Sequence, residues 1–127
     1  MSQQNVDLTR RAFKAFGERD LDALLALLDD DVAAFPMLAG MEGGYHGHGG
    51  VRRWWAGLLG TFPDFQAEIV EVHDLGDLTL AVVRFRGHGA ASAAPLEATA
   101  WQLSRFSRGK CIGWRVYTSE REALEAA

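Results

Sequence analysis

The fold is decided by the stretch LTLAVVRFR, residues 78–86, in which the residue type alternates along the chain. Successive side chains of a β-strand point to opposite faces of its sheet. One face of this segment carries Leu78, Leu80, Val82, Arg84 and Arg86, and the other carries Thr79, Ala81, Val83 and Phe85. We expect the second face to be the drier one and to form the inner side of a sheet.

Three further segments share this β-branched and aromatic character, namely residues 65–72, 97–106 and 111–117. Tight-turn residues separate the first from the second strand at Gly76-Asp77 and the third from the fourth at Arg108-Gly109. Both pairs should therefore form antiparallel hairpins. Small residues fill the connection 87–95, which we expect to be looser.

The first half of the chain is predicted to hold three helices. Apolar residues recur at helical spacing from Leu8 to Phe16. Asp20 is a good N-cap for a second helix, whose apolar face is formed by Leu21, Leu24, Leu25 and Leu28. The acidic run 29–31 should end that helix, because the helix dipole disfavours negative charge there. Residues 32–35 should then be extended.

A glycine-rich segment, residues 40–50, is predicted to be an irregular loop that leads into the third helix. The helical spacing of Val51, Trp54, Trp55 and Leu58 indicates this helix, and Gly60 and Pro63 are its stop signals. At the other end of the chain, the capping-box pattern that begins at Ser119 predicts a short final helix. Together these elements predict an α+β domain in which a cone-shaped, curved antiparallel sheet wraps around the N-terminal helices. The inside of such a cone is either filled by side chains or left as a ligand pocket.

Composition limits the class of protein. The chain has 127 residues, of which 48% are hydrophobic and 24% charged, and we expect a single domain over residues 1–127. A net charge of −4 argues against nucleic acid as a partner. The longest apolar stretch is far shorter than the roughly 20 residues that cross a bilayer, so no membrane partner is expected. One cysteine, Cys111, and a polar start without a secretory pattern predict a cytoplasmic protein.

Several motifs, in this order, resemble the nuclear transport factor 2-like superfamily, particularly its SnoaL-like and ketosteroid isomerase-like members. The similarity covers nearly the whole chain. The matching segments are Asp20-Leu21-Asp22, the Leu25-Ala26-Leu27-Leu28 run before the acidic residues, the stretch from Tyr45 to Trp55, the Arg108-Gly109-Lys110 turn, and Tyr117 before the C-terminal segment 122–127. The resemblance implies a cone-shaped, cystatin-like fold, but a fold alone does not determine function.

The known catalytic residues of this superfamily are not present at the matching positions. Steroid isomerases use a tyrosine, an aspartate base and a protonated aspartate, an arrangement that is a standard example of pKa tuning. By the resemblance these three positions fall on Ala12, Phe35 and Gln102. None of the three can perform the original role near neutral pH. Related epoxide hydrolases use a set of aspartates on the later strands. By the resemblance one of these aspartates falls on Val116, so this set is also missing.

The resemblance implies instead a pocket for a small apolar or aromatic ligand. Its expected lining residues are Phe16, Phe35, Trp54, Leu58, Phe85, Gln102 and Trp114. The alternative for each aromatic residue is that it packs in the hydrophobic core and does not line a pocket. Gln102 would orient a ligand carbonyl or hydroxyl group, or else belong to a network with Tyr45 or ordered water.

Tyr45 and His48 are the candidate acid–base pair, because a histidine beside a helix N-terminus can exchange protons. Their alternative role is helix capping and loop packing. His46 and His48 without a third ligand do not make a metal site, and the glycines do not complete a phosphate-binding motif, so we expect neither a metal nor a cofactor. Two functions stay open: an isomerase- or cyclase-type domain, and a non-catalytic ligand sensor or assembly domain. In the second case Leu80 and Val82 would make a homodimer contact through the outer sheet face.

Overall fold

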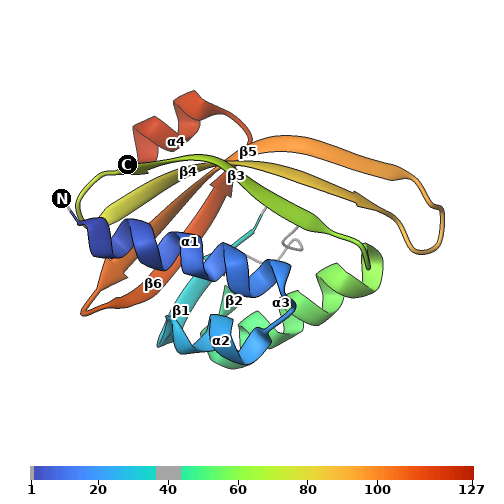
Figure 1. Cartoon of the computed structure of the whole chain (residues 1–127), viewed down its shortest axis with the longest axis horizontal. Helices are drawn as coiled ribbons and strands as arrows, with labels where there is room; N and C mark the ends of the chain where they lie inside the picture. The colour runs from blue at the N-terminus through green and yellow to red at the C-terminus, as the bar shows by residue number, and fades with distance from the viewer. Residues whose placement is uncertain (1, 37–43) are drawn as a thin grey trace.

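A computed structural model describes residues 2–36 and 44–127 of the chain. Figure 1 gives the arrangement of the elements. The helices of this part are α1 (Gln3–Gly17), α2 (Leu21–Ala26), α3 (Gly47–Thr61) and α4 (Glu120–Ala126). The strands are β1 (Leu28–Phe35), β2 (Tyr45–His46), β3 (Gln66–Asp74), β4 (Leu78–His88), β5 (Pro95–Ser107) and β6 (Lys110–Tyr117). The four strands predicted for the second half of the chain are confirmed as β3 to β6.

All strands of the described residues belong to one sheet in the order β2-β1-β6-β5-β4-β3. Strands β3 to β6 form an antiparallel meander, with Ala81 opposite Gln102 and Ser104 opposite Trp114. Strand β1 pairs with β6 in the parallel direction, so the curved sheet that the sequence predicts as antiparallel contains one parallel ladder. This pairing gives β1 a partner far away in the sequence, which local patterns do not reveal.

The helices cover the two faces of the curved sheet unequally. Helices α1, α2 and α3 lie on one side, and α4 lies on the opposite side (Figure 1). Ser2 and Asp20 cap α1 and α2 by accepting the backbone N–H groups of Asn5 and Ala23. Ser119 caps α4 in the same way. The helix starts predicted at Asp20 and Ser119 are therefore confirmed. In the part of the chain that the structure describes, no helix is long and apolar enough to span a membrane.

The second helix ends earlier than the acidic run predicts. Helix α2 stops at Ala26, and β1 already begins at Leu28, which pairs with Cys111 of β6. The aspartates 29–31 consequently lie on a strand and not at a helix exit. The backbone N–H of Cys111 donates to the carbonyl of Leu27, so pairing with β6 satisfies the backbone where the helix would have continued.

The glycine-rich segment is only partly irregular. Gly47, Gly49 and Gly50 belong to α3, against the prediction that the helix starts near Val51, while Gly40 and Gly43 lie outside the described residues. A Cβ atom at Gly50 would lie 3.2 Å from the Tyr45 backbone. This close contact explains why a residue with poor helix propensity stands in the first turn of α3.

The inner sheet face is the dry one, as the alternation in β4 predicts. Thr79, Ala81 and Val83 are fully buried, and Phe85 is nearly so. On the outer face, however, Leu80 is also buried, because it packs with Leu103 and with Ala123 of α4. Val82 is only 9% exposed. The expectation that Leu80 and Val82 are free to contact a second subunit is therefore wrong, since Leu80 is covered by Ala123 of the chain's own α4 and Val82 is also nearly buried.

Candidate functional site

A cavity of about 90 Å³ lies between the N-terminal helices and the inner face of the sheet. Residues from α1, α2, α3 and from strands β1 and β3 to β6 contribute to its wall. Its lining consists of Leu8, Thr9, Ala12, Phe13, Phe16, Leu24, Leu27, Leu28, Pro36, Trp54, Leu58, Phe65, Ala67, Phe85, Gln102, Ser104, Phe106, Cys111, Trp114 and Val116. The three helices that pack on the inner face of the sheet therefore all line this cavity.

A continuous series of aromatic rings forms one wall. The ring of Phe85 lies 5.3 Å from that of Phe65, which lies 5.8 Å from Phe16. Phe16 lies 5.8 Å from Trp54, and Trp54 lies 5.5 Å from Trp114. These centroid distances are those of favourable tilted and edge-to-face pairs. The series links β4 to β6 through α1 and α3, so the helices hold the wall in place.

The polar atoms of the wall are few. Among the described residues the lining includes no Asp, Glu, Lys, Arg or His side chain, and its polar side chains, besides the indoles of Trp54 and Trp114, are Thr9, Gln102, Ser104 and Cys111. The hydroxyl group of Thr9 donates to the carbonyl of Asn5 and lies 2.8 Å from the hydroxyl oxygen of Thr79. The amide of Gln102 and the hydroxyl of Ser104 are 3.5 Å apart on β5. The cavity is therefore apolar with a small polar spot on one strand.

Cys111 is a neutral part of this wall. Its thiol is buried, and this burial raises its pKa from 9.0 to about 11, although a hydrogen bond with the backbone of Gly113 acts in the opposite direction. A thiol is reactive as the thiolate. At neutral pH this side chain therefore behaves as a small apolar group.

We expect native Cys111 to react slowly with iodoacetamide. At pH 8 a shift of the pKa from 9.0 to about 11 lowers the thiolate fraction, and hence the rate, roughly a hundredfold. The measurement is the alkylation rate by mass spectrometry in buffer and in 6 M guanidinium chloride, with glutathione as the reference thiol. Equal rates for the native and the unfolded chain would contradict the buried position.

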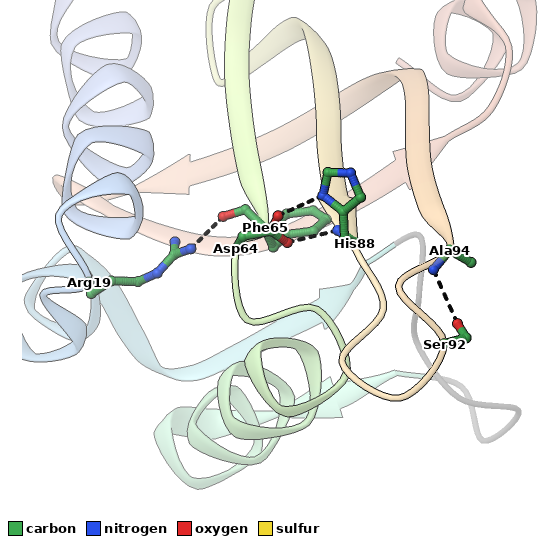
Figure 2. Close-up of polar contacts among 6 residues, drawn as sticks. All are labelled: Arg19, Asp64, Phe65, His88, Ser92 and Ala94. Atoms are coloured by element: carbon green, nitrogen blue, oxygen red, sulfur yellow. Dashed lines mark hydrogen bonds and ion pairs between the residues drawn. The ribbon is translucent and has the colours of Figure 1, made fainter.

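Two sets of hydrogen bonds, one made by Arg19 and one between Asp64 and His88, hold the loop that leads into β3 (Figure 2). The guanidinium group of Arg19 donates to the carbonyls of Phe16 and Phe65, and it stacks 5.0 Å from the centre of the Phe16 ring. Asp64 accepts from the backbone and the imidazole of His88, at 2.7 and 2.8 Å. The imidazole hydrogen bond and then the backbone one lower the pKa of Asp64. Arg19 thus joins two residues that line the cavity.

We expect Arg19→Ala to lower the free energy of unfolding by about 1–2 kcal/mol, through the loss of two charge-assisted hydrogen bonds and a cation–π contact. Arg108→Ala is the matched control, because Arg108 has a similar left-handed backbone, with φ 54° against 58°, and an exposed side chain in the β5–β6 turn. Urea denaturation of both variants provides the comparison. An equal decrease in the free energy of unfolding in both variants would indicate that the contacts of Arg19 do not stabilise the fold.

Six of the seven predicted ligand-binding residues lie around the cavity, namely Phe16, Trp54, Leu58, Phe85, Gln102 and Trp114. Phe35 is not among the lining residues. Its ring lies 4.1 Å below the guanidinium carbon of Arg115 and 6.3 Å from the ring of His46. Phe35 stands near the end of β1, and this register sends its side chain to Arg115 and away from the cavity.

Tyr45 and His48 also lie apart from the cavity wall. His48 Nε2 lies 3.1 Å from the carbonyl oxygen of Leu28 and 4.0 Å from Asp30 Oδ1. Tyr45 is on β2 and packs against the hydrophobic cluster around Val51. The geometry therefore brings neither side chain to the place where a ligand in the cavity would react.

Several lining residues were missed from the sequence, although a signal for some of them was present. Ser104 and Phe106 follow Gln102 at the two-residue spacing of a strand face, and Val116 follows Trp114 in the same way. Thr9 and Ala12 precede Phe16 at helical spacing. Phe65 and Cys111 had no such signal, because their place in the wall depends on how the strands pair.

Comparison with solved structures defines the class of protein. A protein of unknown function from Burkholderia pseudomallei, described as NTF2-like, has 21% identity and a TM-score of 0.82, over 98% of this chain and 97% of that one. A candidate SnoaL-like polyketide cyclase from Jannaschia sp. has 18% identity and a TM-score of 0.80, over 100% and 94% of the two chains. A Mycobacterium tuberculosis protein in complex with estradiol-17β-hemisuccinate has 14% identity and a TM-score of 0.80, over 94% and 97%. The chain therefore has the NTF2-like fold.

The family follows from the sequence match. The model of the SnoaL-like domain matches residues 9–114, which include most of the cavity wall. This chain belongs to the SnoaL-like domain family. No curated protein matches it.

Proposed function

We propose that this SnoaL-like domain binds a small, mostly apolar molecule in the cavity between its helices and the inner sheet face. The observation that carries the proposal is the series of aromatic rings from Phe85 to Trp114, which borders space that the side chains of the described residues leave open. Aromatic walls with a few placed polar groups are typical of small-molecule sites. The steroid complex of the structurally similar mycobacterial protein supports a ligand of this kind.

The size of the cavity limits what it holds without rearrangement. A volume of about 90 Å³ is below the range of roughly 300–1,000 Å³ that is usual for ligand pockets. The present shape accommodates a small group, and a polycyclic ligand requires the aromatic wall to move. Leu58 and Phe85 lie in the same cluster as Phe16, so their movement would be coupled.

Tryptophan fluorescence tests the proposal, because Trp54 and Trp114 line the cavity and Trp101 does not. We expect titration with steroids, anthraquinones and terpenoids to identify a ligand that changes the emission. The change should be smaller in Trp54→Phe and Trp114→Phe and should persist in Trp101→Phe. An emission change that is lost only in Trp101→Phe would contradict the proposed place of binding.

A variant that fills the cavity gives an independent test. Ala12 lines the cavity, so Ala12→Phe should abolish binding while the far-UV spectrum is unchanged. Ala56→Phe is the matched control, because Ala56 is exposed on α3. Equal affinity in both variants, measured by calorimetry, would refute the proposed site.

Isomerase- or cyclase-type proton transfer is not part of this proposal. The candidate pair Tyr45 and His48 lies outside the cavity wall, and Gln102 is a hydrogen-bonding group that does not titrate near neutral pH. Binding without turnover is the function that these residues support. We therefore expect His48→Ala to leave the affinity for a cavity ligand unchanged.

A homodimeric assembly domain is the second candidate. Its support is the pair of aromatic side chains Trp101 and Tyr117, which lie on the outer side of the sheet and are only partly buried. A second subunit that packs on these rings would bury the rest of their apolar surface. Light scattering at several concentrations tests this proposal. A monomer at high concentration would count against it and would leave the ligand-binding proposal intact.

A further inference from the structure

Two polar side chains of the cavity wall, Gln102 and Ser104, lie together on one strand. Gln102 and Ser104 stand at alternate positions of β5, so both side chains point to the inner face. Gln102 lies opposite Ala81 on β4, and Ser104 lies opposite Thr79. Ala81 is small and fully buried, so it leaves room beside the Gln102 amide.

The hydrogen bonds of this spot are incomplete. Gln102 Nε2 and Ser104 Oγ are 3.5 Å apart, at the outer limit of a hydrogen bond. Within the described residues, the hydroxyl proton of Ser104 has no acceptor, although the residue is only 4% exposed. A buried polar group without its full set of partners costs free energy, and a ligand atom placed there recovers it.

The other polar groups of the wall are already engaged. Thr9 donates its single hydroxyl proton to the Asn5 carbonyl, so the 2.8 Å contact with Thr79 uses the proton of Thr79. The thiol of Cys111 points to the Gly113 carbonyl. Apart from the indole N–H groups of Trp54 and Trp114, Gln102 and Ser104 are therefore the polar groups of the described wall that are left to meet a polar atom of a ligand.

Charge is excluded from the same space. The lining residues within 2–36 and 44–127 include no ionisable side chain other than the neutral thiol of Cys111. A carboxylate or an ammonium group of a ligand would lose its hydration without gaining a counter-charge, which disfavours its binding strongly.

We propose that Ser104, together with Gln102, makes the cavity selective for an uncharged ligand that carries one hydroxyl or carbonyl oxygen on an otherwise apolar body. Ser104 donates to this oxygen, and the amide of Gln102 donates to it or accepts its proton. The inference rests on the proposed ligand-binding function and narrows it to neutral alcohols, phenols and ketones. Ser104 is in this sense the specificity-determining residue of the site.

Three probes of nearly the same shape test the inference: p-cresol, toluene and p-toluate. With the wild-type protein, calorimetry should give at least tenfold tighter binding of p-cresol than of toluene, and p-toluate should bind at least a hundredfold more weakly than p-cresol. In Ser104→Ala the affinity for p-cresol should fall about tenfold, whereas that for toluene should stay the same. Ser107→Ala, an exposed position of the same strand, is the matched control and should change neither value.

The outcomes separate the two proposals. Equal affinity for p-cresol and toluene, or tight binding of p-toluate, would overturn the selectivity while ligand binding itself stands. If none of the three probes binds, the selectivity is overturned here, and the fluorescence titration with larger ligands decides the proposed function separately. Should Ser104→Ala fail to fold, the wild-type NMR spectrum gives the second measurement. The side-chain amide signal of Gln102 should shift with p-cresol and not with toluene, and an unchanged signal would contradict the inference.

Discussion

Replacing Phe16 with alanine is expected to lower the free energy of unfolding by about 3–5 kcal/mol. The side chain of Phe16 is 6% exposed, and its ring packs within 6 Å of the rings of Trp54, Trp55 and Phe65. The substitution removes this shared contact from α1, α3 and the start of β3. It also enlarges an existing cavity, which the surrounding rings cannot fill without leaving their favourable positions. Chemical denaturation measures the loss.

The same variant should gain affinity for apolar molecules. A hydrophobic cavity of about 150 Å³ stays dry and binds benzene, so the added space in Phe16→Ala should raise its melting temperature in the presence of toluene more than that of the wild type. Leu124→Ala is the control, because Leu124 is 52% exposed on α4 and should cost less than about 0.5 kcal/mol. A loss below about 1 kcal/mol in Phe16→Ala would contradict the central place of this ring.

Gly44→Ala is expected to lower the free energy of unfolding by about 2–5 kcal/mol. Gly44 has φ +97°, a backbone conformation that costs a residue with a side chain about 1–3 kcal/mol. An added Cβ atom would lie 2.4 Å from the carbonyl oxygen of Ala34 and 2.6 Å from the ring of Phe35, and such overpacking adds a similar cost. Chemical denaturation again gives the measurement.

A second glycine provides the control with the opposite sign. Gly57 lies inside α3, and a Cβ atom there would meet nothing within 4 Å. Gly57→Ala should raise the stability by about 0.5–1 kcal/mol, because alanine loses less backbone entropy in a helix. If both variants were equally stable, the close contact between Gly44 and β1 would not exist in solution.

Local patterns were sufficient for most of the secondary structure. The alternation around Ala81 and Val83 identified the inner face of β4, and both residues are fully buried. Asp20 and Ser119 marked the starts of α2 and α4, where their side chains accept backbone N–H groups. These signals are readable because caps and strand alternation depend on residues that are close in sequence.

The errors occur where a distant segment competes with a local preference. Helical spacing favoured Leu28 as part of α2, but parallel pairing with Cys111 draws Leu28 into β1. Phe35 has the aromatic character expected of a cavity wall, yet it stacks against Arg115. Leu80 and Ala123 are 43 positions apart, and their contact closes an outer surface that the alternation alone left open.

Local sequence patterns were enough to identify strands β3 to β6, the starts of α2 and α4 and the apolar inner face of β4, because periodicity and capping depend on neighbouring residues. The resemblance to a known family added the NTF2-like fold class, which the solved structures confirm. The tertiary structure was needed to show that Phe16, Trp54 and Trp114 meet around one cavity, that Tyr45 and His48 lie apart from it, and that no described residue accepts the hydroxyl proton of Ser104. The physical reason is strand register, since a shift of one residue sends a side chain to the opposite face of the sheet.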